Sequence, residues 1–255
     1  MLLFATGIRS MLAVHWVVLF AMILAAWAGL FAMSVPADLR DASRLFGAEF
    51  WTALCTVTPD MAGFARVAAM WLLMSTAMML PTALPAFAAY DDLARAGAPA
   101  SPLMLAGGFL AVWGGASLVF AGAQMLLFRA DLVSGFGDSR SALLSATLLA
   151  AAGAYQFSPL KAACLSACRA PVAFFLQHWD ARPVVQGLRL GATCLGCCWA
   201  LMLLAFVGGM ASLAFMGLAT LIMALEKLPE FGRRISGPLG GLLFAAAAWT
   251  AVTGI

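Results

Sequence analysis

Long apolar runs bounded by charged residues, proline or glycine are the main feature of this chain. A helix that crosses the roughly 30 Å hydrocarbon layer of a bilayer needs about 20 mostly apolar residues. Such runs cover Met11–Met33, Val67–Ala89, Met104–Phe128, the shorter Ser141–Phe157, and Pro238–Ile255. The pattern predicts an all-α, polytopic transmembrane helical bundle that forms one integral membrane domain over residues 1–255.

The apolar stretch between Arg189 and Glu226 is too long for one span. Leu190 to Leu225 comprises 36 residues, and one continuous helix of that length would reach about 54 Å. Gly208–Gly209 lies near its middle, and glycine accepts the backbone angles of a tight reversal. We therefore predict two helices here and about seven in total. Six helices, with part of this stretch re-entrant, is the alternative.

The longest polar region separates the first two runs. Residues 34–66 are predicted to form an extramembrane loop, whose apolar patch Phe50–Cys55 is expected to lie at the membrane interface. The first run exceeds the length of a signal-peptide core, which favours a retained helix. With seven helices, nine Lys and Arg residues fall on the N-terminal side and five on the other. This asymmetry predicts a cytoplasmic N-terminus.

Composition limits the classes of protein that the chain can represent. It is 64% hydrophobic and 10% charged, with a mean hydropathy of +1.00, whereas soluble domains carry about 25% charged residues. A water-soluble globule and a disordered chain are both excluded. The net charge of +3 is too small to indicate nucleic-acid binding. The lipid bilayer is therefore the predicted surrounding of the chain.

Five of the six cysteines fall into two tight groups. Cys164 and Cys168 follow Ser158–Pro159, a typical N-cap and first helical residue, which predicts a short interfacial helix with both thiols on one face. Cys194, Cys197 and Cys198 are expected to open the fifth membrane helix, again on one face. If the short helix folds back onto the fifth, all five sulfur atoms converge.

Sulfur ligands select Cu(I), zinc or iron–sulfur clusters. Lys161, Arg169 and Arg189 are placed in the sequence to favour thiolates, whereas Glu226 and Lys227 are expected to anchor a span end at the interface. With only two histidines, histidine-based zinc catalysis has little support. A buried cysteine often serves only as a small apolar residue, but two tight groups favour a metal or redox role.

Methionines narrow the choice of metal. Met70, Met74 and Met78 recur every four residues along one side of a predicted helix, and Met79 and Pro81 follow. Thioethers bind Cu(I) but are poor zinc ligands. A methionine stripe by itself is more typical of core packing. Together with the cysteines, it makes Cu(I) the predicted ligand and zinc the alternative.

Three segments resemble a known family. Trp71–Pro85, Pro159–Pro171 and Cys194–Met202 are similar to the bacterial predicted metal-binding integral membrane proteins, a domain of unknown function that includes the membrane copper chaperone accompanying a bacterial tyrosinase. The similarity covers residues 67–227. It implies a multi-pass protein of the bacterial inner membrane that handles copper, without catalysis of its own. The implied partners are a copper-dependent oxidase or a copper-carrier protein.

The resemblance also assigns residues. It implies metal contact for the cysteines, and matches three methionines to the family's second motif, giving Cys164, Cys168, Cys194, Cys197, Cys198, Met74, Met78 and Met79. The resulting hypothesis is a Cu(I) chaperone or transfer protein that assists metallation of a cuproenzyme. The alternative is a membrane thiol-disulfide oxidoreductase that cycles Cys194 and Cys197 between dithiol and disulfide.

Overall fold

The computed structural model describes residues 14–34, 57–96, 101–177, 179–180, 182–210 and 212–254. Within these residues the fold is all-α, as predicted, and the only β pairing is an isolated bridge between Val133 and Ser139. Five helical segments are long and apolar enough to cross a membrane: α2 (Val14–Ser34), α5 (Met61–Arg95), α6 (Pro102–Arg129), α10 (Pro183–Leu203) continued by α11 (Ala205–Gly208), and α13 (Phe231–Thr253). The chain is therefore a multi-pass membrane protein.

A sixth crossing is formed only if two bent helices count as one span. The helices α7 (Ala142–Gln156) and α8 (Pro159–Arg169) pass the length test together and are bent by 62° at their junction. The predicted sixth full helix is wrong, because α12 (Leu213–Glu226) has 14 residues and reaches only about 21 Å. The predicted reversal before it is confirmed, since Gly209 has a φ of 90°. The six-helix alternative fits better than seven.

Several boundaries differ from the sequence prediction. The helix α5 begins at Met61, inside the predicted loop, because the side chain of Asp60 caps it by accepting from the backbone N–H of Gly63 at 2.8 Å. The apolar patch of that loop lies outside the described residues. Pro238 was predicted to start the last helix, but it lies inside α13.

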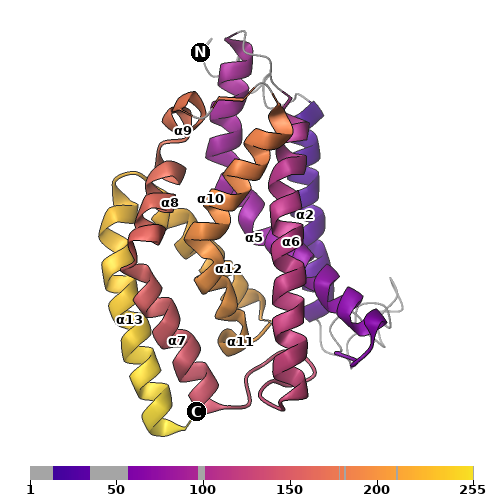
Figure 1. Ribbon diagram of the computed structural model, residues 1–255, viewed down its shortest axis with the longest axis vertical. Coiled ribbons are helices and arrows are strands. Elements are labelled where there is room, and N and C mark those ends of the chain that lie inside the picture. Colours follow the sequence, from indigo (N-terminus) through magenta and orange to yellow (C-terminus); the bar gives the residue numbers. More distant parts are fainter. Residues whose placement is uncertain are drawn as a thin grey trace.

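Figure 1 shows how the helices surround the centre of the bundle. α5 packs against α2 and α6, and α6 packs along α10. α7 and α13 lie side by side as a second layer, with α12 between them and α5 (Figure 1). α8 continues from α7 and packs against α10, and the short α9 (Pro171–Gln177) packs against α5.

Glycine sets the position of α10 on α6. A Cβ atom at Gly187 would lie 2.1 Å from the carbonyl oxygen of Leu105, and one at Gly108 would lie 2.2 Å from that of Val184. The two backbones can approach this closely only because both residues lack a side chain. α10 is thereby held against α6 over its first two turns.

Proline and tryptophan fix the contact between α5 and α2. Pro81 has no N–H, so the carbonyl of Ala77 loses its partner within the helix. The indole N–H of Trp27, on α2, donates to that carbonyl at 2.9 Å. The proline therefore provides a docking point for the neighbouring helix in the apolar interior.

Candidate metal-binding site

Three cysteines of α10 form a compact thiol cluster, here called the triad: Cys194, Cys197 and Cys198. Their sulfur atoms all lie within 4.8 Å of one another, and each residue is at most 2% exposed. The spacing i, i+3, i+4 puts them on one helix face. They lie past the middle of α10, so the prediction that they open the helix is wrong. The helix starts earlier, with Pro183 at its first position.

The other two cysteines, Cys164 and Cys168, lie on α8 and are called the α8 pair. α8 begins at Pro159 as predicted, and the Ser158 hydroxyl accepts from the backbone N–H of Lys161 at 3.1 Å. Both thiols are partly exposed.

The α8 pair lies beside the triad. The sulfur of Cys164 lies against α10, because a Cβ atom at Gly196 would be only 2.6 Å from it. Cys168 is in side-chain contact with Cys197. The two thiol groups therefore meet, although the cluster whose sulfurs all lie within 4.8 Å contains the triad alone among the residues described.

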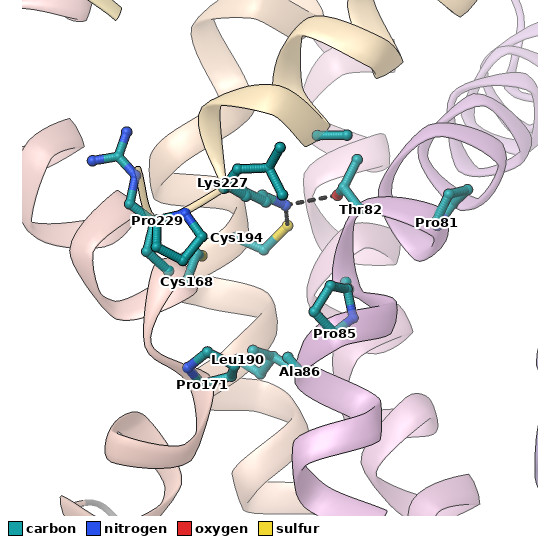
Figure 2. Close-up of a pocket in the computed structure, with 14 residues that line it drawn as sticks. Pro81, Thr82, Pro85, Ala86, Cys168, Pro171, Leu190, Cys194, Lys227 and Pro229 are labelled. Carbon is teal, nitrogen blue, oxygen red and sulfur yellow. Dashed lines mark hydrogen bonds between the residues drawn. The ribbon is translucent and has the colours of Figure 1, made fainter. Parts of the chain in front are cut away.

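Lys227 supplies the positive charge at the triad. Its ammonium group donates to the sulfur of Cys194 at 3.2 Å and to the hydroxyl of Thr82 at 2.6 Å (Figure 2). The prediction that Lys227 anchors a span end at the interface is therefore wrong. After the reversal at Gly209, α12 brings Lys227, the residue that follows its last turn, to the level of Cys194. Residues 33 positions apart in the sequence thus meet, and no local pattern signals such a contact.

The cations expected to favour the thiolates make other contacts. Lys161 pairs with Glu226, and Arg169 donates through Nε to the carbonyl oxygen of Glu226 at 2.8 Å. Arg189 lies 3.9 Å from Asp180 at the start of α10. Hydrogen bonds from Arg182 lower the pKa of Asp180 there, away from the thiols.

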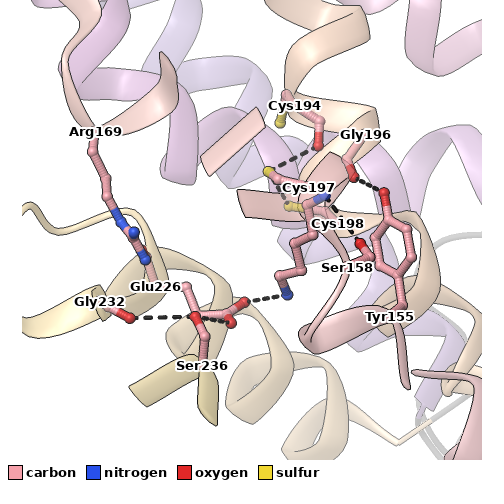
Figure 3. Close-up of polar contacts among 11 residues, drawn as sticks. Tyr155, Ser158, Arg169, Cys194, Gly196, Cys197, Cys198, Glu226, Gly232 and Ser236 are labelled. Carbon is pink, nitrogen blue, oxygen red and sulfur yellow. Dashed lines mark hydrogen bonds and ion pairs between the residues drawn. The ribbon is translucent and has the colours of Figure 1, made fainter. Parts of the chain in front are cut away.

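A buried ion pair holds α8 in place next to the thiols. The Lys161 ammonium lies 2.8 Å from the Glu226 carboxylate, and both side chains are at most 2% exposed. The other carboxylate oxygen accepts from the Ser236 hydroxyl at 2.9 Å (Figure 3). α8, α12 and α13 are thereby joined through one carboxylate, contrary to the prediction of an interfacial role for Glu226. Such a pair is costly to break, because either partner alone is a buried, uncompensated charge.

Tyr155, at the end of α7, is a further contact that the sequence does not reveal. Its hydroxyl donates to the carbonyl oxygen of Gly196, between the two parts of the triad (Figure 3). Its ring packs edge-on against Trp199 at a centroid distance of 4.9 Å. The break between α7 and α8 is therefore fastened to the cysteine-bearing part of α10.

A cavity of about 340 Å³ adjoins the thiols. It lies between α5, the α8–α9 junction, α10 and the turn after α12 (Figure 2). Of the five cysteines of the two groups, only Cys168 and Cys194 line it, and Thr82, Arg169 and Lys227 do so as well. The remaining wall is largely apolar, with several prolines.

The three predicted methionines, Met74, Met78 and Met79, are buried in α5. Met78 and Met79 precede Thr82 by four and three residues, so they lie on the same side of the helix as this cavity-lining residue. Met74 lies one turn before Met78. None of the three methionines lines the cavity, and the role of their thioethers as ligands stays a prediction.

The donor chemistry of the site suits a soft cation. Its described side chains offer thiols, one ammonium and one hydroxyl near the triad. Sulfur donors of this kind suit Cu(I), zinc or iron–sulfur clusters. His15 lies elsewhere, on α2, 3.3 Å from Asp91.

Comparison with known proteins agrees with this chemistry. A family model described as PpoB2, copper chaperone, matches residues 68–250. No curated protein and no solved structure matches the chain. The matched region runs from α5 into α13 and includes the triad, the α8 pair and Lys227. It confirms the family resemblance found in the sequence, and the chain belongs to the PpoB2 family of copper chaperones.

Proposed function

We propose that this protein is a membrane Cu(I) chaperone that passes the ion to a cuproenzyme, with the triad as its principal ligand set. The observation that carries the proposal is the burial of three sulfur atoms within 4.8 Å of one another. Cu(I) with two thiolates has a charge of −1, and the Lys227 ammonium beside Cys194 offsets it. Such compensation matters because an unpaired charge in an apolar interior is costly.

The remaining sulfur residues extend this site in the proposal. Cys164 and Cys168 serve as exchange ligands at the edge of the triad, because they are partly exposed and lie on a separate helix. Met74, Met78 and Met79 offer a path along α5 for an ion that leaves the triad. Thioethers along this path favour Cu(I) over zinc.

The proposed setting is the bacterial inner membrane with the N-terminus in the cytoplasm. This orientation is the one that the sequence predicts from a seven-helix count of Lys and Arg residues, and that count includes Lys161 and Lys227, whose charges the structure places inside the bundle. The proposed partners are the copper-dependent oxidase that receives the ion and a copper carrier that supplies it. The whole chain acts as one integral membrane domain without catalysis of its own.

Metal analysis of the purified full-length protein tests this proposal. We expect Cu(I) to bind the unchanged protein and resist a competing chelator, while a Cys194→Ser, Cys197→Ser and Cys198→Ser triple variant retains no copper above background. Cys55→Ser is the matched control and should bind as the unchanged protein does. The proposal fails if the unchanged protein holds no copper, or if the triple variant holds as much.

The same preparations separate a chaperone from a thiol oxidoreductase. A redox enzyme would show a reversible disulfide between Cys194 and Cys197 when free thiols are trapped under oxidising and reducing conditions. A copper chaperone should show the same extent of thiol trapping under both conditions, because the bound ion protects the cysteines from oxidation. A reversible disulfide in the absence of copper binding would replace the present proposal with the redox function.

A further inference from the structure

We propose that the cavity beside Cys194 is the loading site for a small, anionic thiolate complex of Cu(I), and that Cys194 is the first residue of the triad to take the ion. This inference rests on the proposed function, because it names the form in which that copper arrives. It is carried by the position of the cavity, its lining and its size.

Cys194 is the one residue common to the cavity and the triad. Cys197 and Cys198 do not line the cavity, whereas Cys194 and Cys168 do. An ion that enters by this route therefore meets Cys194 before the other two thiols of the triad. Figure 2 shows the Cys194 sulfur at the cavity wall, directly below the Lys227 ammonium.

The volume of the cavity indicates that its occupant is larger than a bare ion. About 340 Å³ lies in the range of small-molecule sites, which extends from roughly 300 to 1,000 Å³. A single cation would leave nearly all of this space empty. The cavity has room for the organic part of a small carrier that brings the ion.

The lining indicates the charge and softness of that carrier. Its polar side chains are two thiols, the Thr82 hydroxyl and the cationic groups of Lys227 and Arg169, and no carboxylate is among the lining residues described. Arg169 also lines the cavity, and its Nε donates to the carbonyl oxygen of Glu226 at 2.8 Å. A Cu(I) ion held by two small thiolates has a charge of −1 and soft ligands, so it matches an ammonium beside two sulfurs.

The turn between α12 and α13 forms one side of the opening. Leu228 and Pro229 lie on this turn and line the cavity, and Leu228 is 46% exposed. Glu230, Arg233 and Arg234 follow directly in the sequence. A cluster of charges at this point places the opening on the aqueous side of the site, where a charged complex can reach it.

Transfer from such a complex needs ligand exchange only. The Cys194 sulfur, as the thiolate paired with Lys227, forms a bond to Cu(I), and one carrier thiolate leaves with its electron pair. A thiol of Cys197 or Cys198 then forms the second bond to copper and gives its proton to the second carrier thiolate. Copper stays Cu(I) throughout, and the products are one carrier thiolate and one carrier thiol.

Rapid-mixing kinetics on the full-length protein test the loading route. The donors are the Cu(I) complex of N-acetylcysteine and, as a bulky complex, Cu(I) bathocuproine disulfonate. Ala86→Leu reduces the cavity from inside, and Leu228→Trp narrows it at an exposed position that leaves the interior intact. Leu242→Trp, at a 67% exposed site on α13, is the matched control.

We expect both cavity variants to load from N-acetylcysteine at least about tenfold more slowly, with unchanged copper content at equilibrium. The control should load at the rate of the unchanged protein. The bulky complex should load slowly and at one rate in all variants. Equal rates for the cavity variants and the unchanged protein would overturn the loading route, whereas absence of copper at equilibrium in the unchanged protein would overturn the proposed function itself.

Discussion

The triad on α10 and the α8 pair differ in burial and in the rigidity of their support. The triad lies within a long helix that is fixed against α6 by close glycine contacts, and its residues are at most 2% exposed. The α8 pair lies on an 11-residue helix bent by 62° from α7, and both of its cysteines are partly exposed. We infer that the triad determines copper affinity and the α8 pair determines the rate of exchange.

Lys161→Met should have the largest effect, a loss of stability, because it removes the ion pair that holds α8 against α12. The substitution leaves Glu226 buried without its partner, which costs about 3–5 kcal/mol of folding free energy. Unfolding in detergent should occur at lower denaturant, and Cys164 and Cys168 should react faster with an impermeant maleimide. Adding Glu226→Gln should restore much of the loss. Equal stability of the single variant and the unchanged protein would show that the pair does not hold α8.

Lys227→Met should have the next largest effect, and it acts on the triad. Hydrogen bonds to charged groups are worth about 1.5–3 kcal/mol, so loss of the ammonium beside Cys194 should raise the Kd for Cu(I) by roughly 30-fold. Chelator competition measures this change. Lys227→Arg keeps the charge and should retain part of the affinity. An unchanged Kd in Lys227→Met would show that the Lys227 ammonium does not compensate the charge of the copper site.

Cys164→Ser together with Cys168→Ser should affect affinity less and exchange more. Because the triad remains, we expect the copper content at saturation to be unchanged and the Kd to rise by about tenfold at most, or about 1.4 kcal/mol. Transfer to a chelator in rapid-mixing experiments should slow by more than the Kd changes. Loss of all bound copper in this variant would reverse the roles of the two groups.

Gly196→Ala should give the smallest effect. Its methyl group would lie 2.6 Å from the Cys164 sulfur, so this thiol must shift while the triad stays in place. We expect a change of a few-fold in exchange rate, and none when Cys164→Ala is already present, because the Cβ atom of residue 164 lies at an ordinary contact distance of 3.6 Å. Gly217→Ala is the control, since a Cβ there would meet nothing within 4 Å.

Local features of the sequence predicted much of the fold. The length of the apolar runs predicted the membrane helices. Ser158–Pro159 predicted the start of α8, and Gly208–Gly209 predicted the reversal before α12. Helix ends were less predictable. α10 extends beyond Arg189 to Pro183, because a charged residue near a helix end does not terminate the helix.

The sulfur residues of the site could be predicted from the sequence, whereas the contacts of its charged and polar residues could not. Cysteine spacing within one helix is a local property, so the triad could be found from the sequence. The partners of Lys161, Lys227 and Tyr155 lie on other helices, 65, 33 and 41 residues away. Those contacts depend on how α12 returns beside α10 and how α8 bends from α7, which no local pattern encodes.

X-ray absorption at the copper edge of the Cu(I)-loaded protein tests most directly whether the triad holds the ion. We expect two or three sulfur neighbours around copper and a spectrum that Cys164→Ser with Cys168→Ser leaves nearly unchanged. That spectrum should be lost when Cys194, Cys197 and Cys198 are all replaced by serine. Nitrogen or oxygen neighbours in the unchanged protein, or a spectrum that depends on the α8 pair and survives without the triad, would contradict this expectation.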